Sequence, residues 1–206
     1  MKWLRGNWDQ VLVALGEHIV ISLTALTIAF ALSLAIGIWA ARNDRVFRWA
    51  IAASGLLYTV PTLAFLALLI PVVGLGKANA IICMVAFSLM IMIRNVAIGI
   101  RDVPREVVDA ATGMGMNRVE VLTRIELPLA LPVIIAGLRI ATVTVISVTV
   151  VAAYVNAGGL GTIIFAGISN DYAPKIWTGA LTACALAVAA DLGLARLEGF
   201  ARRRAS

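Results

Sequence analysis

The long uncharged run at residues 19–41 most restricts how this chain folds. About 20 consecutive apolar residues let a helix cross the hydrocarbon core of a bilayer. A backbone inside a bilayer must satisfy its own hydrogen bonds, so such runs predict membrane-spanning helices. The whole chain agrees, because 62% of its 206 residues are hydrophobic and only 14% are charged. A soluble chain has about 45–50% apolar and about 25% charged residues, so an ordinary soluble domain is excluded.

Four more segments have the length and hydropathy of spans. Together they predict five transmembrane helices, at residues 19–41, 49–70, 78–100, 129–153 and 176–195. Arg139 lies inside the fourth segment, where an arginine costs about 2.5–3.5 kcal/mol to insert into the membrane. The apolar residues of the segment outweigh this cost, so the span is retained. We expect the Arg139 side chain to snorkel or to face protein. We therefore predict an all-α polytopic membrane protein, with residues 1–206 forming a single transmembrane domain.

The distribution of basic residues predicts the orientation. The net charge of +6 has two interpretations: a nucleic-acid partner, or basic residues gathered on the cytoplasmic side of a membrane. Five spans place Lys2, Arg5, Lys77 and Lys175 on one side, and on the other Arg42, Arg45, Arg48, Arg94, Arg101, Arg105, Arg118, Arg124, Arg196, Arg202, Arg203 and Arg204. Positive loops lie inside, so we expect an external N-terminus and a cytoplasmic C-terminus. Every basic loop adjoins a span, which argues against a nucleic-acid partner.

Three smaller features are an apolar N-terminal segment, two cysteines and a single histidine. Apolar residues recur at helical spacing before the first span and predict a short interfacial helix: Trp3, Leu4, Trp8, Val11, Leu12 and Leu15. Cys83 and Cys184 lie in apolar runs and are interpreted as packing residues. His18 is the only histidine and has too few partners for a zinc site, so we expect no metal.

The segment 101–128 is too polar to cross the membrane, yet it is organised. Asp102 can cap a first helix that has Pro104 and Glu106 in its first turn. An apolar stripe and two glycines follow, at Val107, Val108, Ala111, Met114, Gly113 and Gly115. Asn117 and Glu120 predict a capping box for a second short helix, before Leu127-Pro128 opens the fourth span. From composition alone, these helices either cover the bundle or bind a partner.

The motif within this segment favours a partner. The spacing of Asp109-Ala110-Ala111, Gly115, Ile125 and Leu127-Pro128 resembles the EAA loop of ABC importer permeases, with Asp in place of the usual Glu. The resemblance implies a MetI-like fold. It also implies a coupling loop that docks in a cleft of the ATP-binding subunit and carries its motion to the membrane helices. The residues expected there are Asp109, Ala110, Ala111, Gly113, Gly115, Asn117, Glu120, Ile125, Leu127 and Pro128.

Further segments are similar to permeases for glycine betaine, carnitine and choline. They are residues 58–64, 68–71, 94–100, 113–116, 126–137 and 157–165. The resemblance implies an osmoprotectant importer of a bacterial cytoplasmic membrane that works by alternating access. Its expected partners are two ATP-binding subunits carrying ATP and Mg, a second permease copy or paralogue, an extracytoplasmic solute-binding protein and membrane lipid. Another small solute, such as an amino acid, remains an alternative.

The chain has no motif for hydrolysing ATP. Gly74-Leu75-Gly76-Lys77 lacks the spacing of a phosphate-binding loop, so we expect a membrane subunit with no cofactor and no catalytic residue of its own. An intramembrane protease would need a GxSG motif, and Ala52-Ala53-Ser54-Gly55 lacks its first glycine. A passive channel is the other distant alternative, and the EAA-like loop argues against it.

Polar residues inside the spans are candidates for a translocation pathway. Tyr58, Thr59, Pro61 and Thr62 indicate either a kink whose freed carbonyls bind threonine hydroxyls, or a pathway position. Asn95 and Asn156 are further candidates. The sequence shows no cluster of aromatic residues that would hold a quaternary ammonium by cation–π contact, so we expect selectivity to reside in the binding protein.

Overall fold

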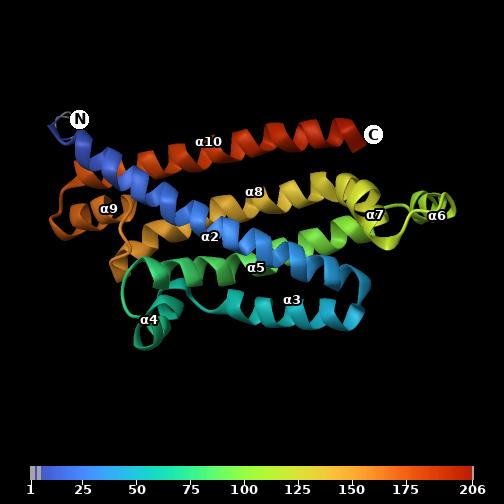
Figure 1. The fold of residues 1–206 in the computed structure, drawn as a ribbon. Coiled ribbons are helices and arrows are strands. Elements are labelled where there is room, and N and C mark those ends of the chain that lie inside the picture. Colours follow the sequence, from blue (N-terminus) through green and yellow to red (C-terminus); the bar gives the residue numbers. More distant parts are fainter. Residues whose placement is uncertain (1–2, 4–5, 206) are drawn as a thin grey trace.

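The chain folds into a bundle of long helices, with its two termini at opposite ends (Figure 1). The structure is a computed structural model that describes residue 3 and residues 6–205, with side chains up to residue 203. These residues form helices and turns and contain no strand, so the all-α prediction is confirmed. Lys2, Leu4 and Arg5, and the side chain of Arg204, belonged to the sequence-based predictions and lie outside the described residues.

Helix α2 (Trp8–Arg42) runs along the whole bundle without a break. The prediction of a separate interfacial helix is therefore wrong from Trp8 onward, since Val11, Leu12 and Leu15 belong to α2. No proline separates them from the span, and Gly16 alone costs only about 1 kcal/mol within a helix. The helix simply continues through it.

Helix α2 packs closely on α5 (Lys77–Arg101) through a row of small residues. Ala25, Ala29, Ser33 and Gly37 recur every four residues, and all are buried. A Cβ atom on Gly37 would lie 2.6 Å from Cβ of Val96 on α5. Small residues that bring helix backbones together are typical of membrane bundles.

The predicted single helix at 49–70 is wrong, because the structure has two helices there. Helix α3 (Asp44–Thr59) and helix α4 (Thr62–Val73) meet at an angle of 99°. Pro61 lacks an N–H donor and forces Val60 into an extended conformation, with φ −70° and ψ 128°. The hydroxyl of Thr59 donates to the carbonyl of Leu56 at 2.7 Å, which is the kink interpretation made from the sequence.

The second half of the chain begins with α6 (Arg105–Gly113) at the C-terminal end of the bundle. Then α7 (Arg118–Val121), the π-helical turn η1 (Leu122–Glu126), α8 (Leu127–Ala152) and the 3₁₀ turn η2 (Ala153–Val155) follow without interruption. Helix α9 (Leu160–Ser169) is short, and α10 (Ala173–Ala205) returns along α8.

Four helices are long and apolar enough to cross a membrane: Trp8–Arg42, Lys77–Arg101, Arg118–Val155 and Ala173–Arg203. The bent pair α3/α4 gives a fifth if it crosses as one unit. The described residues thus contain four or five candidate spans where the sequence predicts five. Helix α10 is much longer than the predicted range 176–195, because Asp191 and Glu198 are paired and do not end it.

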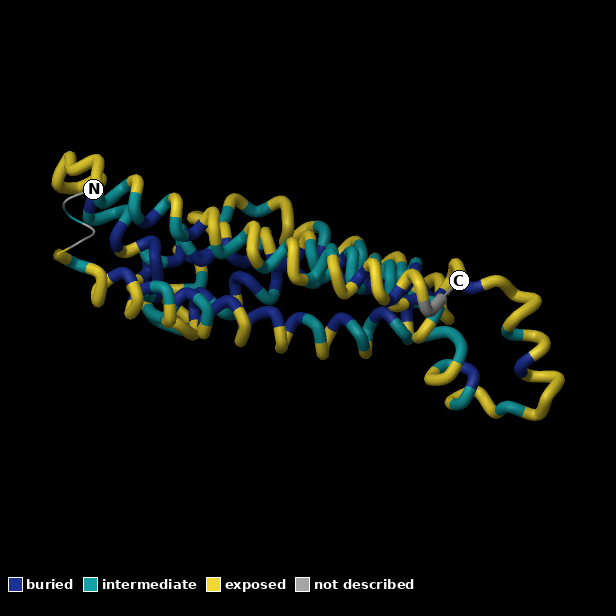
Figure 2. Tube along the Cα trace, turned by 90° about the horizontal axis from the view of Figure 1, so that it is seen from above, coloured by how far each residue is buried: buried dark blue, intermediate teal, exposed yellow. Residues whose placement is uncertain are grey.

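The core lies where α2, α5 and α8 face one another, as the buried inward faces in Figure 2 show. Large apolar side chains fill it, including Ile21, Met84, Met92 and Val145. It also contains a polar pair, because the hydroxyls of Ser22 and Thr149 lie 2.9 Å apart.

Candidate functional site

Helices α6 and α7 extend beyond the other helices at the C-terminal end (Figure 2). Helix α6 begins at Arg105, with Pro104 at its N-cap position. The predicted cap Asp102 is wrong, because this residue ends α5 and its side chain does not cap α6. Pro104 has φ −56° and ψ 129°, an extended conformation that the proline ring allows just before the first helical residue. Glu106 lies in the first turn as predicted.

Gly115 ends this first helix through a glycine turn. Its φ is +88°, in the left-handed region that glycine enters without steric cost. The N–H of Met116 donates to the carbonyl of Ala111 at 3.2 Å, and the N–H of Gly115 donates to that of Thr112 at 2.9 Å. These two bonds form a Schellman motif, which fixes the direction of the chain after α6. Gly113 is the last residue of α6 itself.

The predicted capping box is confirmed. Oδ1 of Asn117 accepts from the N–H groups of Val119 and Glu120, both at 3.0 Å. The carboxylate of Glu120 accepts from the N–H of Asn117 at 2.9 Å. Three N–H groups that would otherwise lack partners at the helix start are therefore satisfied by side chains.

The second helix is not separate from the fourth span, contrary to the prediction. It continues through η1 into α8, and Ile125 lies within the π-helical turn. This wider turn directly precedes Pro128, whose ring would clash with the carbonyl four residues earlier in a regular helix. A single π-helical turn inside an α-helix frequently occurs at functional positions.

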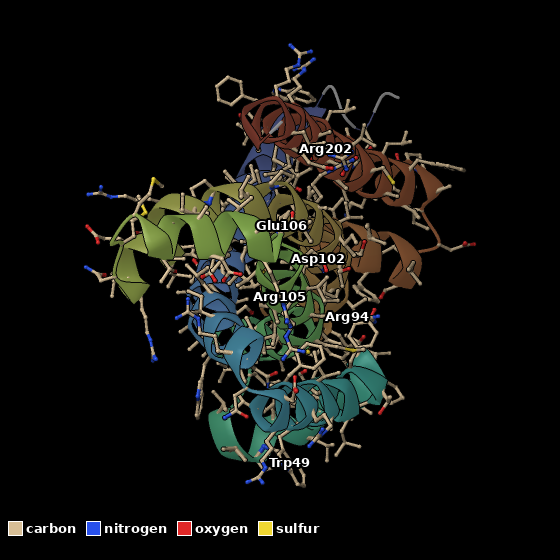
Figure 3. The ribbon with its side chains drawn as sticks, turned by 90° about the vertical axis from the view of Figure 1, so that its right-hand side faces the viewer. Trp49, Arg94, Asp102, Arg105, Glu106 and Arg202 are labelled. Carbon is tan, nitrogen blue, oxygen red and sulfur yellow. The ribbon has the colours of Figure 1, made fainter. Side chains whose placement is uncertain are left out.

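The apolar stripe of α6 is divided between two faces. Ala111 is buried and Val108 is half-buried, so these residues hold α6 to the body. Val107, Met114 and Val119 are exposed, as are Asp109 and Ala110. In Figure 3, which looks onto this end, Asp102, Arg105 and Glu106 lie near the middle, between Trp49 at one edge and Arg202 at the other. The exposed side of α6 therefore points away from the bundle.

Two clefts separate α6 and α7 from the helix ends below them. One of about 250 Å³ lies between Val108, Thr112 and Val121, and one of about 400 Å³ lies between Asp44, Arg105 and Asp109. Arg42 and Glu126 line both clefts, and Nη2 of Arg42 donates to Oε2 of Glu126 at 2.6 Å. This ion pair joins the end of α2 to η1.

Arg101 makes a second link between helix ends. Its guanidinium donates to the carbonyls of Ala40 and Ala41, at 2.7 and 3.1 Å. It also pairs with Asp44 at 2.8 Å and lies 4.5 Å from the ring centre of Phe47. Sequence reasoning used Arg42 and Arg101 only to orient the chain and missed these contacts. They join residues about 60 and 84 positions apart, and no local pattern carries that information.

The candidate pathway residues are not gathered in one place. Tyr58, Thr59, Pro61 and Thr62 lie at the break between α3 and α4. Asn95 lies in α5, where its amide donates to the carbonyl of Ile91 at 2.7 Å. Asn156 follows η2 in the left-handed conformation, with φ 59°, and is exposed.

Aromatic residues that are separate in the sequence meet at the break between α3 and α4. The ring centres of Tyr58 and Phe87 are 5.8 Å apart, and so are those of Phe65 and Phe87, both in edge-to-face arrangements. Tyr58 is 42% exposed. The sequence did not show this aromatic cluster, because α5 supplies Phe87 from another part of the chain; Phe87 itself is buried.

At the opposite end of the bundle, two residues of α2 bind the start of α9. Nδ1 of the fully buried His18 accepts from the N–H of Leu160 at 3.3 Å, so Nε2 carries the hydrogen that is shared with the carbonyl of Ile146 at 3.1 Å. Glu17 accepts from the N–H of Gly159 at 3.1 Å. The described residues contain no group of side chains suited to a metal ion. A histidine alone in an apolar run gave no signal of this structural role.

Arg139 faces protein, which was one of the two expectations for it. Its Nε and Nη2 donate to the two carboxylate oxygens of Asp191, at 2.9 and 3.0 Å, and its Nη1 donates to Glu198 at 2.7 Å. Arg202 binds the other oxygen of Glu198 at 2.6 Å. All three partners belong to α10.

These features define a polytopic helical membrane protein with a capped, exposed helical segment at one end. The chain belongs to the family of binding-protein-dependent transport system inner membrane components, whose pattern it matches over residues 33–202. It is a permease subunit of an ATP-binding-cassette importer, located in the membrane, as the sequence resemblance indicated.

Similar proteins cover nearly all of the chain. It is 37% identical over 199 residues to the carnitine transport permease protein OpuCB of Listeria monocytogenes, covering 96% of this chain and 91% of the relative. It is 36% identical over 199 residues to the choline transport system permease protein OpuBD of Bacillus subtilis, covering 96% and 88%. Over 156 residues it is 36% identical to the ergothioneine transport permease/ergothioneine binding protein EgtU of Helicobacter pylori, covering 76% of this chain and 28% of that protein.

Solved structures confirm the fold. The chain superimposes on an inward-facing structure of the MetNI methionine ABC transporter with a TM-score of 0.85 and 18% identity, covering 95% of this chain and 98% of that one. A crystal structure of an amino acid ABC transporter with histidines gives a TM-score of 0.73 and 15% identity, covering 97% and 96%. The MetI-like permease fold is therefore shown.

Proposed function

We propose that this permease imports small solutes that carry a trimethylammonium group. The observation that supports this substrate class is the similarity, over 96% of the chain, to permeases named for carnitine, choline and glycine betaine. These three solutes share one quaternary nitrogen and differ in the rest of the molecule. Ergothioneine, named for a further relative, contains the same group.

The segment α6–α7 is the proposed docking surface for the ATP-binding subunit. The exposed apolar side chains Val107 and Met114 lie between a defined helix start and a fixed glycine turn, and exposed Val119 follows in the capped helix α7. Helices that present apolar residues to solvent are suited to binding in a groove of another protein. The docking residues are Asp109, Ala110, Ala111, Gly113, Gly115, Asn117, Glu120, Ile125, Leu127 and Pro128. ATP and Mg bind to the partner, which does the hydrolysis, so this chain has no catalytic role.

The assembly follows from the number of helices. Four or five spans are few for a complete pathway, so a second copy or a paralogue completes it. Two ATP-binding subunits bind on the cytoplasmic side, where the C-terminus and α6 lie, and a solute-binding protein docks outside, beside the N-terminus. The excess of arginine at the α6 end supports this orientation. Residues 1–206 act as one permease domain.

The proposed pathway passes the break between α3 and α4. Tyr58, Thr59, Pro61 and Thr62 lie there, beside Phe65 and Phe87. An aromatic ring attracts a quaternary ammonium through its face, without a hydrogen bond. Asn95 and Asn156 belong to the pathway in other positions. Alternating access moves the solute past these residues, while the external binding protein sets most of the selectivity.

Uptake measurements in cells test this function. Cells with and without the chain receive labelled glycine betaine, carnitine and choline in medium of high osmolarity. One variant, Gly115→Ala, places a Cβ at φ +88°; its control, Gly16→Ala, adds the same methyl to an open helical site. We expect the labelled solutes to enter only cells that contain the chain. Uptake should fall in Gly115→Ala and stay unchanged in Gly16→Ala.

The other outcomes separate the alternatives. If no quaternary amine enters but the chain still binds an ATP-binding subunit, the solute is of another class, such as an amino acid. If uptake continues without ATP, the chain is a passive channel and the coupling proposal is wrong.

A further inference from the structure

Helix α10 is attached to the bundle in two different ways along its length. Near its start it packs tightly on α9, where a Cβ atom on Gly179 would lie 2.6 Å from a side-chain carbon of Ile164. Among residues 185–203, by contrast, only Glu198 and Ala201 are buried. The second half of α10 therefore has few fully buried residues, although several of its apolar side chains are half-buried.

An apolar groove separates this second half from α2. The groove has a volume of about 490 Å³ and is lined by Leu23 and Phe30 of α2, Leu138 of α8, and Ala190 and Leu194 of α10. Helix α8 is thus the neighbour that holds the second half of α10, and the ion network of Arg139 joins the two helices there.

The geometry of this network links two turns of α10 to one side chain. Asp191 and Glu198 lie seven residues apart, which is about 10 Å along the helix. The guanidinium of Arg139 binds both carboxylates, with a two-pronged contact to Asp191. Lysine has no planar fork and cannot reproduce this arrangement. Arg202 balances the charge by binding the other side of Glu198.

The network is difficult to open, because Arg139 lies inside a candidate membrane span. It lies twelve residues into α8, about 18 Å from Leu127. An unpaired charge inside a span is costly, and charged residues there remain paired or face protein. If α10 slid along α8, Arg139 would lose both of its partners and Asp191 would lose Arg139, while Glu198 would keep only Arg202 of its own helix. The favoured movement is therefore one in which the two helices stay in register.

The same helix α8 also carries the docking segment. Residues 118–155 form one unbroken helix, so a displacement of α7 acts directly on α8. We propose that Arg139 is a positioning residue that clamps α10 to α8, so that both helices move as one rigid pair when the ATP-binding subunit displaces α6 and α7. That the ATP-binding subunit causes the displacement rests on the proposed function. That α8 and α10 form a rigid pair does not.

A distance measurement tests the rigid pair. Spin labels are placed at Ile140 on α8 and Leu192 on α10, which are 56% and 54% exposed, after Cys83 and Cys184 are replaced by alanine. The assembled transporter is measured in nanodiscs without nucleotide and with trapped ATP. We expect the same label separation in both states. A change of about 5 Å, one helical turn, would overturn the proposal.

A neutral variant tests the role of the ion network. In Arg139→Gln/Asp191→Asn/Glu198→Gln all three charges are removed together, so only Arg202, whose side chain is mostly exposed, loses its partner and the chain can still assemble. We expect a broader distribution of distances between the two spin labels in this variant. We also expect ATP hydrolysis within about twofold of the unchanged protein, but at least about tenfold less uptake per ATP, within the usual range of coupling effects.

Controls distinguish a clamp from a general structural effect. Arg196→Gln removes an exposed arginine of α10 outside the network and should change neither readout. Arg139→Lys keeps the charge without the fork and should give an intermediate loss of coupling. The clamp would be excluded if the neutral variant kept a narrow distribution of label distances and the same uptake per ATP as the unchanged protein. If the unchanged protein transports no quaternary amine, only the substrate proposal fails, since the label separation is still measured.

Discussion

Nη2 of Arg42 lies 2.6 Å from Oε2 of Glu126 and so joins the last turn of α2 to the π-helical turn η1. The two side chains are 41% and 13% exposed. A partly exposed ion pair contributes only about 0–1 kcal/mol to stability. Its position is more significant than its strength, because it links α2 to the turn between the docking segment and α8.

The first prediction concerns this ion pair. Glu126→Gln should leave the free energy of unfolding within about 1 kcal/mol of the unchanged protein. It should lower the uptake per ATP hydrolysed, because α2 no longer follows η1. Uptake and ATP hydrolysis measured together in proteoliposomes test this. The reversed pair Arg42→Glu/Glu126→Arg should recover coupling, and failure to recover it while the complex assembles would contradict the prediction.

The second prediction concerns the close approach of α2 and α5. In Gly37→Ala, the new methyl would meet Val96 at 2.6 Å, so the helices must separate. Overpacking of this kind costs about 1–3 kcal/mol. Unfolding in mixed detergent micelles should show this loss, whereas Gly16→Ala, with nothing within 4 Å, should show almost none. Equal stability of both variants would mean that α2 and α5 are more loosely packed than described.

The third prediction concerns the start of α7. Asn117→Ala removes the acceptor of the capping box and should cost about 1 kcal/mol at this helix start. The frayed segment should bind the ATP-binding subunit more weakly. Asn117→Asp keeps the acceptor and should bind normally. Affinity of the purified permease for the subunit gives the comparison, and identical binding by both variants would count against docking at α7.

Local signals in the sequence predicted local structure well. Asn117 and Glu120 are three residues apart, so their capping box depends on nothing outside the segment. Gly115 ends α6 for the same kind of reason. The 99° bend after Thr59 was underestimated, because two prolines and two glycines within an apolar run indicate interruptions without giving an angle. The angle depends on how α4 packs against α5.

Contacts between distant segments were not visible in the sequence. Arg139 was recognised as unusual, but its partners Asp191 and Glu198 lie 52 and 59 residues away. Phe87 joins Tyr58 and Phe65 only because α5 packs against the broken span. Such pairings follow from the arrangement of helices, which periodicity and spacing leave open.

The fourth prediction concerns the buried histidine. His18→Leu fills similar space but removes the acceptor for the N–H of Leu160. A buried N–H without a partner costs about 1–3 kcal/mol, so the variant should unfold more easily. His18→Ala should lose more, because a cavity is added to the lost hydrogen bond. Equal stability of the leucine variant and the unchanged protein would show that water or another group satisfies this N–H.

The last prediction concerns Tyr58, which offers a partly exposed aromatic ring beside Phe87 at the break between α3 and α4. If a trimethylammonium group passes this ring, the face of the ring matters and the hydroxyl does not. Tyr58→Phe should therefore transport normally, whereas Tyr58→Leu, with a side chain that is apolar but not aromatic, should transport more slowly. A cation–π contact is worth about 0.5–2 kcal/mol, which corresponds to a decrease of roughly two- to thirtyfold. Initial uptake rates at saturating binding protein give the comparison, and equal rates for phenylalanine and leucine would exclude Tyr58 from the pathway.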